Sequence, residues 1–361
     1  MIWILTAGFG DGHNAAARGI RDAWSRQQPK VPVVMEDWLL RQKPLLSGLS
    51  MAAYREVIVH CPALWRLAYR RLEKRPEEAL HPLLLELLRG PLEDDLVRFR
   101  PKAIVSTYPL YSSLLDALRQ DGFPVPPLLT VVTDALSIHP TWVFSPSDRY
   151  AVIESKSAAE LVRQGVEGSK ISVTGFPVRL DYLEPKPARP SSPGVLYLPS
   201  TPGSHVEETL GELDRSLPQG TRLTVVMGRH DRRLYHRMRR FVDNCSHVRL
   251  DVHGWTEQVP VLMRQHDLVI TKAGGAIVHE VMAAAVPAII DCVVPGQEEG
   301  NAQEIVDAGG AALSKSPQET AKLAAQWLSG PGQLQLMLTA LAKVSRPDAA
   351  LRVVDEVLRM I

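Results

Sequence analysis

The stretch MIWILTAGFGDGHNAAARGI, residues 1–20, contains the pattern that decides the fold of the chain. Its apolar residues 2–5 are typical of a buried strand, and its alanine-rich end is typical of a helix. Between them lie three glycines at alternate positions, Gly8, Gly10 and Gly12. Glycines at a strand-to-helix turn let backbone N–H groups approach a bound ligand closely. The stretch therefore predicts a first βα unit with a ligand-binding loop.

Strand-like and helix-like segments alternate through the rest of the chain, which predicts parallel βαβ units. VPVVMED, KAIVSTY, PLLTVVTD, RYAVI and KISVTG continue the first series of strands, and we expect a long helical region at about 45–98. The proline-rich segment DYLEPKPARPSSPG interrupts the alternation, because proline suits neither a helix interior nor a central strand. A second series of strands then follows: VLYLPS, RLTVVMG, HVRLDV, DLVIT and PAIID.

This alternation predicts an α/β protein with two Rossmann-like, doubly wound domains, each built on a parallel sheet. We expect the first domain at 1–178, a proline-rich linker at 179–193 and the second domain at 194–345. The apolar face of a final helix at 346–361 predicts that this helix packs back near the first domain.

The composition of the 361 residues, 45% hydrophobic and 22% charged, is typical of a globular protein. A net charge of +1 argues against a general nucleic-acid-binding surface. Cys61, Cys245 and Cys292 are far apart in the sequence, which fits a reducing compartment and no zinc site. The apolar runs at the N-terminus and near 281–290 are too short for a signal peptide or a membrane span. We therefore expect a cytoplasmic protein, which can still bind a membrane surface.

The spacing of Gly8, Gly10 and Gly12 misses the dinucleotide-binding pattern G-x-G-x-x-G by one residue. That pattern also needs an acidic residue about twenty positions on, which binds the ribose. Glu36 and Asp37 follow the second strand and could supply this carboxylate. A dinucleotide site and a plain glycine turn therefore both remain open from the spacing alone.

His13 and Asp134 are the candidate catalytic residues. His13 stands where the first helix begins, and the positive end of a helix favours a neutral imidazole, which can act as a general base. Asp134 ends a strand in TVVTDALSIHPTWV, residues 130–143, so we expect it in the same crevice as His13. An alternative role for Asp134 is to cap a turn. His139 and Trp142 follow on the same loop.

A second glycine turn lies in DLVITKAGGAIVHEVMAAAVPAIIDCVVPGQEEGNAQEIVDAGGA, residues 267–311. Its glycines let backbone N–H groups approach a phosphate at a helix start. Glu280 in this helix can accept hydrogen bonds from a diol such as ribose. Gln297, Glu298 and Asn301 offer the amide and carboxylate groups that suit sugar hydroxyls. Phosphate, diol and polyol groups in one ordered block predict a nucleotide-sugar site rather than a plain glycine turn with solvated acids.

Two basic stretches, WRLAYRRLEKR at 65–75 and RHDRRLYHRMRRF at 229–241, mix arginines with aromatic and apolar residues. A charged helix face is often only solvated. The same pattern also suits contact with anionic lipid headgroups, since a basic amphipathic helix can lie on a membrane surface. Both interpretations remain open from the sequence.

The block at 267–311 resembles the donor-binding motif of GT-B glycosyltransferases, and GFGDGH resembles the acceptor-side glycine loop of one of their families. This family, glycosyltransferase family 28, contains MurG and the monogalactosyldiacylglycerol (MGDG) synthases. VVTDALSIHPTWV, VTGFPVR and VVPGQEEGNA look closest to its branch of MGDG synthases and processive diacylglycerol glucosyltransferases. The resemblance runs from about residue 2 to about residue 312.

The resemblance implies two Rossmann-like domains that face a cleft, a UDP-sugar donor, inversion at the anomeric carbon and no metal or other cofactor. It implies a membrane lipid as acceptor, with diacylglycerol expected, and a place at the inner face of the cell membrane. No nucleic-acid partner is expected. The donor-binding residues that it implies are Arg179, Gly203, Ser204, Gly228, Trp255, Lys272, Gly274, Gly275, Glu280, Gln297, Glu298 and Asn301. The acceptor-binding residues are Gly10, Gly12, Tyr108, His139 and Trp142, beside His13 and Asp134 as base or relay.

Several alternatives keep the same fold. The acceptor could be a polyprenyl-linked sugar or a soluble compound. The protein could be a UDP-sugar 2-epimerase, which needs no acceptor, or a sensor of nucleotide sugars without catalysis. A dinucleotide-dependent oxidoreductase has only the imperfect glycine loop in its favour. The sequence does not choose between hexoses, since epimers differ by one hydroxyl.

Overall fold

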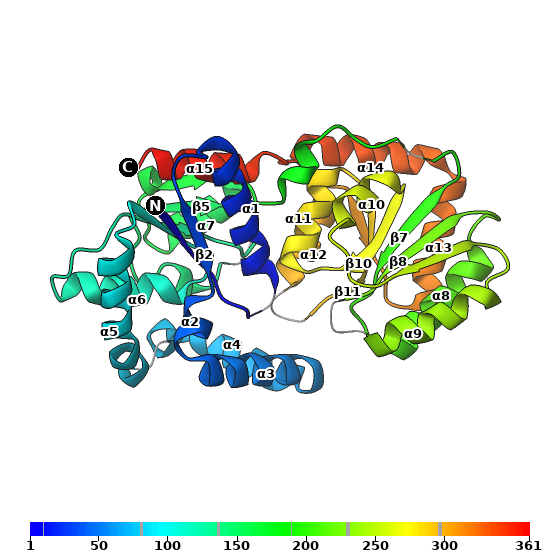
Figure 1. Ribbon diagram of the computed structural model, residues 1–361. Helices are drawn as coiled ribbons and strands as arrows, with labels where there is room; N and C mark the ends of the chain where they lie inside the picture. The colour runs from blue at the N-terminus through cyan, green and yellow to red at the C-terminus, as the bar shows by residue number, and fades with distance from the viewer. Residues whose placement is uncertain (10, 80–81, 136–137, 189, 229–231, 295–297) are drawn as a thin grey trace. The chain divides into compact units, whose positions relative to one another are not determined.

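The computed structural model describes residues 1–9, 11–79, 82–135, 138–188, 190–228, 232–294 and 298–361 (Figure 1). The chain forms two compact units: Met1–Leu180 together with Pro347–Ile361, and Asp181–Arg346. Each unit carries one sheet of six strands in which the given pairings are all parallel. Two doubly wound α/β domains, as the alternation predicted, are thereby confirmed.

The sheet of the first unit has the order β2-β1-β3-β4-β5-β6. Its strands are β1 (Ile2–Leu5), β2 (Val33–Glu36), β3 (Ala103–Ser106), β4 (Leu128–Val131), β5 (Arg149–Val152) and β6 (Ile171–Val173). Its helices are α1 (Asp11–Gln27), α2 (Trp38–Gln42), α3 (Pro44–His60), α4 (Pro62–Lys74), α5 (Pro82–Phe99), α6 (Leu110–Gln120), α7 (Ser155–Arg163) and α15 (Ala349–Leu358).

The sheet of the second unit has the order β12-β11-β10-β7-β8-β9. Its strands are β7 (Gly194–Leu198), β8 (Arg222–Val226), β9 (Arg249–His253), β10 (Leu268–Lys272), β11 (Ala288–Cys292) and β12 (Ala311–Leu313). Its helices are α8 (Gly203–Ser216), α9 (Arg232–Phe241), α10 (Val259–Gln265), α11 (Gly275–Ala284), α12 (Glu299–Asp307), α13 (Pro317–Ser329) and α14 (Pro331–Val344). Short 3₁₀ turns are η1 (Pro76–Ala79), η2 (Pro140–Trp142), η3 (Gly168–Lys170), η4 (Leu180–Leu183) and η5 (Val242–Asn244).

The predicted long helical region at about 45–98 is helical, and the chain divides there into α3, α4, η1 and α5. Pro62, Pro76 and Pro82 each begin a new element. A proline lacks the N–H that would continue a preceding helix, and it pushes the residue before it out of helical geometry. Cys61, which precedes Pro62, accordingly has φ −135° and ψ 55°. The short edge strand β12 was not predicted.

Alternating side chains of β1 enter two different cores, one on each face of the first sheet. Ile2 and Ile4 pack in the cluster that contains Trp24 of α1 and residues of α15. Trp3 and Leu5 pack on the other face with residues of α2, α5 and α6. A strand that is buried on both faces reads as a continuous apolar run, which explains why residues 2–5 were recognised from sequence. Figure 1 shows α15 beside α1, and the two helices are in contact.

Strand order reverses beside β1 in the first sheet and beside β7 in the second, so that β1 lies between β2 and β3, and β7 between β8 and β10. In open α/β sheets, ligands bind at the carboxyl ends of the strands near such a reversal. The segments that follow these strands are therefore the first places to look for a site. Among the residues that the structure describes, no helix is long and apolar enough to cross a membrane.

We predict that Gly19→Ala destabilises the first unit by roughly 1–3 kcal/mol through overpacking. A Cβ atom at Gly19 in α1 would lie 2.5 Å from the carbonyl oxygen of Pro177 and 2.8 Å from that of Val178. The matched control is Gly48→Ala in α3, where a Cβ atom would meet nothing within 4 Å. The control should stabilise its helix by up to about 1 kcal/mol. Calorimetric unfolding of both variants measures the difference, and equal effects would contradict the close packing of α1.

Candidate functional site

Residues that follow three neighbouring strands of the first unit meet around the ring of His13. His13 lies in the first turn of α1, and its Nδ1 atom is 3.0 Å from the Thr133 Oγ1 atom beyond β4. Tyr108, beyond β3, contacts the His13 ring edge-to-face, with ring centroids 5.1 Å apart. The Trp142 ring lies 5.9 Å from that of His13. The structure thus brings together His13, Tyr108 and Trp142.

Asp134 joins this cluster through Trp142. The buried indole donates its Nε1–H to Asp134 Oδ2 at 2.8 Å, which fixes one carboxylate oxygen. Asp134 also acts electrostatically on His13, since its charge raises the pKa of the imidazole. A carboxylate so close to a histidine stabilises the imidazolium that forms when the ring takes a proton.

The pKa of His13 is nevertheless lowered below its ordinary value. Burial is the main cause, because it disfavours the charged ring, while Asp134 and a hydrogen bond with the backbone of Thr107 act in the opposite direction. His13 is therefore neutral at pH 7, which is the state that a general base needs. The sequence predicted this state from the helix dipole, whereas the structure gives burial as its main cause.

The other predicted acceptor-side residues have different surroundings. His139 is buried, and its Nδ1 atom accepts a hydrogen bond from the backbone N–H of Thr141 at 3.3 Å. This contact caps η2, the turn that carries Trp142. At Gly12 a Cβ atom would meet nothing within 4 Å, so the first turn of α1 is open at that position. Gly10 lies outside the described residues. Acceptor binding by His139 and Gly12 stays a prediction.

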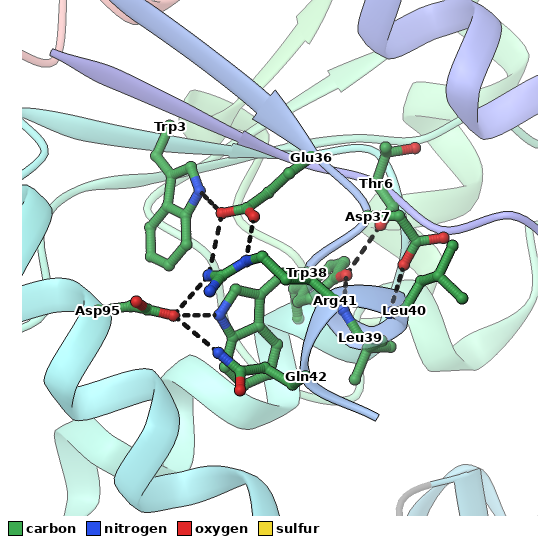
Figure 2. Close-up of polar contacts among 11 residues, drawn as sticks. Trp3, Thr6, Glu36, Asp37, Trp38, Leu39, Leu40, Arg41, Gln42 and Asp95 are labelled. Atoms are coloured by element: carbon green, nitrogen blue, oxygen red, sulfur yellow. Dashed lines mark hydrogen bonds and ion pairs between the residues drawn. The ribbon is translucent and has the colours of Figure 1, made fainter. Parts of the chain in front are cut away.

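The carboxylates that a dinucleotide site would need are engaged within the protein. Glu36 accepts hydrogen bonds from Trp3 Nε1 at 2.7 Å and from Arg41 Nε at 2.5 Å (Figure 2). Asp37 accepts backbone N–H groups from Gly8 at 2.8 Å and Leu40 at 2.9 Å. Both side chains support the chain itself, which argues against a ribose contact at either residue.

On the second unit, Lys272 at the end of β10 and Glu298 form an ion pair, with Nζ 2.6 Å from Oε1. The other oxygen of Glu298 accepts the backbone N–H of Val294 at 3.0 Å. Gly274 precedes α11, and a Cβ atom there would lie 3.0 Å from Cε of Lys272. Glycine at this position therefore lets the lysine fold over the helix start, where an anion is favoured.

Asn301 is hydrogen-bonded to the same turn, between β10 and α11. Its buried side chain donates Nδ2–H to the carbonyl of Ala273 at 3.1 Å. Glu280 lies in α11, one helical turn and more beyond Gly275. Gln297 lies outside the described residues. The structure thus groups Lys272, Glu298 and Asn301 at one turn, and sugar binding by any of them stays a prediction.

The remaining donor-side residues follow other strands of the second sheet. Gly203 and Ser204 begin α8 beyond β7, Gly228 follows β8, and the half-exposed Trp255 follows β9. Because carboxyl ends of parallel strands share one edge, these residues lie at the same edge as Lys272. Arg179 belongs to the first unit.

Sequence reasoning missed a buried pair that joins α11 to α12. His279 is buried, its Nδ1 atom is 2.6 Å from the carbonyl oxygen of Gly275, and its Nε2 atom is 3.1 Å from Glu304 Oε2. The pair ties the helix start at Gly275 to the helix that follows Glu298. A histidine among apolar residues of a helix gives little signal in a sequence, because its partner is set by helix packing.

Two family profiles match the chain. Residues 13–178 match the profile of monogalactosyldiacylglycerol (MGDG) synthase, and residues 208–330 match that of the glycosyltransferase family 28 C-terminal domain. A probable chloroplastic MGDG synthase of Nicotiana tabacum is 27% identical over 98% of this chain and 70% of its own length. The MGDG synthase of Spinacia oleracea is 28% identical over 99% of this chain and 72% of its own length.

Solved structures share the fold at low sequence identity. MurG of Acinetobacter baumannii superposes with a TM-score of 0.63 at 14% identity, covering 99% of both chains. The UDP-GlcNAc 2-epimerase of Neisseria meningitidis, bound to UDP-GlcNAc, also gives a TM-score of 0.63, at 12% identity over 99% of both chains. These similarities confirm the GT-B class of the two-domain fold, and at such identities they show the fold alone.

We predict that His13 titrates below the ordinary histidine pKa of about 6.5. Burial is the cause, as described above, and NMR titration of the His13 ring measures the value. The folded state then binds fewer protons at this ring than the unfolded chain, so stability falls as pH drops below about 6.5. A His13 ring that stays protonated at pH 7 would contradict both the burial and the assignment as a base.

Proposed function

This chain belongs to the GT-B glycosyltransferases of the family that contains MurG and the MGDG synthases, and on that basis we propose its reaction. It transfers a hexose from a UDP-sugar to a hydroxyl group of a membrane lipid, with diacylglycerol as the acceptor. The observation that carries the proposal is the cluster of His13, Tyr108, Trp142 and Asp134 at the carboxyl end of the first sheet, where the pKa of His13 is lowered. The lipid acceptor is supported by the names of the similar MGDG synthases.

In the proposed step, the acceptor oxygen attacks the anomeric carbon of the donor from the face opposite UDP. A bond forms between these two atoms, the bond from the anomeric carbon to the UDP oxygen breaks, and UDP leaves with the electron pair. The hydroxyl proton passes to His13, and Asp134 stabilises the resulting imidazolium. A single displacement of this kind inverts the anomeric centre.

The charge of the departing UDP needs stabilisation, which we assign to protein groups without a metal ion. The start of α11 and Lys272 supply positive charge at the end of β10. One ammonium N–H of Lys272 binds Glu298, and an ammonium group has three donors, so others remain for an anion. Further groups assigned to the donor are Arg179, Gly203 and Ser204 for the diphosphate, Gly228 and Trp255 for uracil, Glu280 for ribose, and Gln297, Glu298 and Asn301 for the sugar.

Membrane contact through the first unit is part of the proposal. Leu45 and Leu49 of α3 are 82% and 70% exposed, and Leu67 of the neighbouring α4 is 68% exposed. In α4, Arg71 pairs with Glu78 at 2.7 Å, whereas Arg70 and Lys74 are exposed. Exposed leucines beside exposed basic groups suit a surface of anionic lipid.

The basic stretch of the second unit gives weaker support for membrane contact. Arg237 of α9 pairs with Glu207 of α8 at 2.6 Å, which offsets part of its charge. Residues 229–231 of this stretch lie outside the described residues. Peripheral binding is therefore assigned to α3 and α4 of the first unit.

The reaction is tested by incubating the protein with a panel of radiolabelled UDP-sugars and diacylglycerol. We expect at least one of these UDP-sugars to donate its sugar to the lipid. His13→Ala should lower kcat about 10²- to 10⁴-fold, with little change in the KM of the donor. His247→Ala, at an exposed histidine before β9, is the matched control and should retain activity. Donor binding without transfer to any lipid would overturn the lipid acceptor, and isomerised UDP-sugar without acceptor would identify an epimerase.

Membrane binding is tested by cosedimentation with phosphatidylglycerol vesicles. The double variant Leu45→Glu/Leu49→Glu should bind at least about tenfold more weakly, since burying one leucine contributes roughly 1.5–3 kcal/mol. The control Leu336→Glu changes an equally exposed leucine of the second unit and should bind like the unaltered protein. Unaltered protein that stays in the supernatant would overturn membrane binding and favour a soluble acceptor.

A further inference from the structure

We propose that Asp37 is a positioning residue of the candidate active site. Its carboxylate holds the backbone of the loop between β1 and α1, and through Phe9 of this loop it positions Tyr108, against which the His13 ring lies. The inference rests on the proposed role of His13 as the base. It assigns a function to one of the two carboxylates at the end of β2, Glu36 and Asp37.

The carboxylate of Asp37 joins two separate segments of backbone. Oδ2 accepts the N–H of Gly8 in the loop at 2.8 Å, and Oδ1 accepts the N–H of Leu40 in α2 at 2.9 Å. The second contact caps α2, and the first reaches a residue 29 positions earlier in the chain. The Asp37 side chain thus makes two separate contacts: one caps α2, and the other, with Gly8, holds the loop.

The loop is held at its beginning as well. The N–H of Thr6 donates to the carbonyl of Glu36 at 3.1 Å, and the carbonyl of Thr6 accepts the Tyr111 hydroxyl at 2.8 Å. The same tyrosine oxygen accepts the N–H of Leu39 at 3.3 Å. The Thr6 hydroxyl also donates to Asn14 Oδ1 at 3.0 Å. Gly8 is therefore the next fixed point of a loop whose first residue is already in place.

Gly8 lies too close to its neighbours for any side chain. A Cβ atom there would lie 2.6 Å from Sδ of Met51 in α3 and 3.4 Å from Oδ2 of Asp37. Met51 and Asp37 therefore confine the backbone of Gly8 from two elements, α3 and the start of α2. The glycine serves this close approach of main chain and carboxylate rather than a bound phosphate.

The residue after Gly8 transmits its position to His13. The ring of Phe9 stacks on that of Tyr108, with centroids 5.6 Å apart and an angle of 10°. The ring of Tyr108 in turn contacts that of His13 edge-to-face at 5.1 Å. A shift of the Gly8 backbone therefore moves Phe9, and through Phe9 it moves Tyr108, whose ring contacts that of His13.

Asp37 itself is fixed by an ionic network on both sides (Figure 2). Arg41 contacts Glu36 at 2.5 Å and Asp95 of α5 at 2.6 Å, and Trp38 Nε1 donates to Asp95 at 2.8 Å. Glu36 and Trp38 are the immediate chain neighbours of Asp37. A residue between two anchored neighbours has little freedom, which is what a group that positions a loop needs.

The charge of Asp37 brings no evident gain in stability. Burial raises the pKa of its carboxyl, although the N–H groups of Leu40 and Gly8 act against this. A raised pKa means that the ionised form is held less favourably in the folded protein than in the unfolded chain. The contacts of this carboxylate are therefore better explained by the loop that it holds than by a gain in folding stability.

The experiment separates the two contacts of Asp37. Asp37→Ser keeps a side-chain oxygen that caps α2 but is too short to hold Gly8 as well. We expect faster hydrogen exchange of the amides in residues 6–12 and a fall in kcat of about 10- to 100-fold, the size expected of a small misplacement at a reacting centre. The KM of the UDP-sugar should not change, because Asp37 lies in the first unit.

Asp148→Ser is the matched control in the same unit. Asp148 also accepts a backbone N–H, that of Leu128 at 2.7 Å. It lies just before β5, at the amino end of that strand, whereas Asp37 follows the carboxyl end of β2. This variant should leave kcat and the exchange of residues 6–12 unchanged. Unaltered loop exchange in Asp37→Ser, or unaltered kcat despite faster exchange, would overturn the positioning role. If the unaltered protein transfers no sugar, the proposed function fails, and hydrogen exchange still decides whether Asp37 holds the loop.

Discussion

The parallel pairing of β1 with β3 is the contact on which the candidate active site depends. Its register aligns Leu5 with Ser106, and the next pairing aligns Ser106 with Thr130. The segments that follow these three strands must therefore leave the sheet at one edge and at nearly one level. His13, Tyr108 and Asp134 come from segments far apart in the chain, and this register brings the segments that carry them to the same ends of the strands. Any slip of one residue would turn the strand side chains to the wrong faces.

Burial and charge act differently on His13 in the first unit and on Lys272 in the second. In the first unit, burial keeps His13 neutral while Asp134 is placed to stabilise the protonated ring. In the second unit, Lys272 remains close to a helix start because Glu298 pairs with it. The first arrangement suits a group that must gain a proton, and the second suits a site that must hold an anion without moving far. Both rely on interactions that are stronger away from water.

Much of the fold was predictable because most strands contain a short apolar run, as β1 and β10 do. The helical region at about 45–98 was predicted, but the breaks that its prolines make between α3, α4 and α5 were not placed. The short strand β12 was not predicted, because three residues at a sheet edge are too few to show an alternation of apolar and polar side chains. Glu36 and Asp37 were recognised as candidates for a ligand, but their spacing could not show that Arg41 and Gly8 already occupy them.

The amino-acid sequence by itself determined the two α/β domains, the glycine turns and the family resemblance, because strand periodicity and turn residues are local properties of a chain. It also predicted that His13 and Asp134 lie at neighbouring strand ends, whereas β3 lies between the two strands that they follow. Only the tertiary structure decided which groups these residues meet: Trp142 on Asp134, Glu298 on Lys272, and Asp37 on Gly8. A hydrogen bond needs its two atoms about 3 Å apart. That distance follows from how strands and helices pack together, and no local pattern of residues records it.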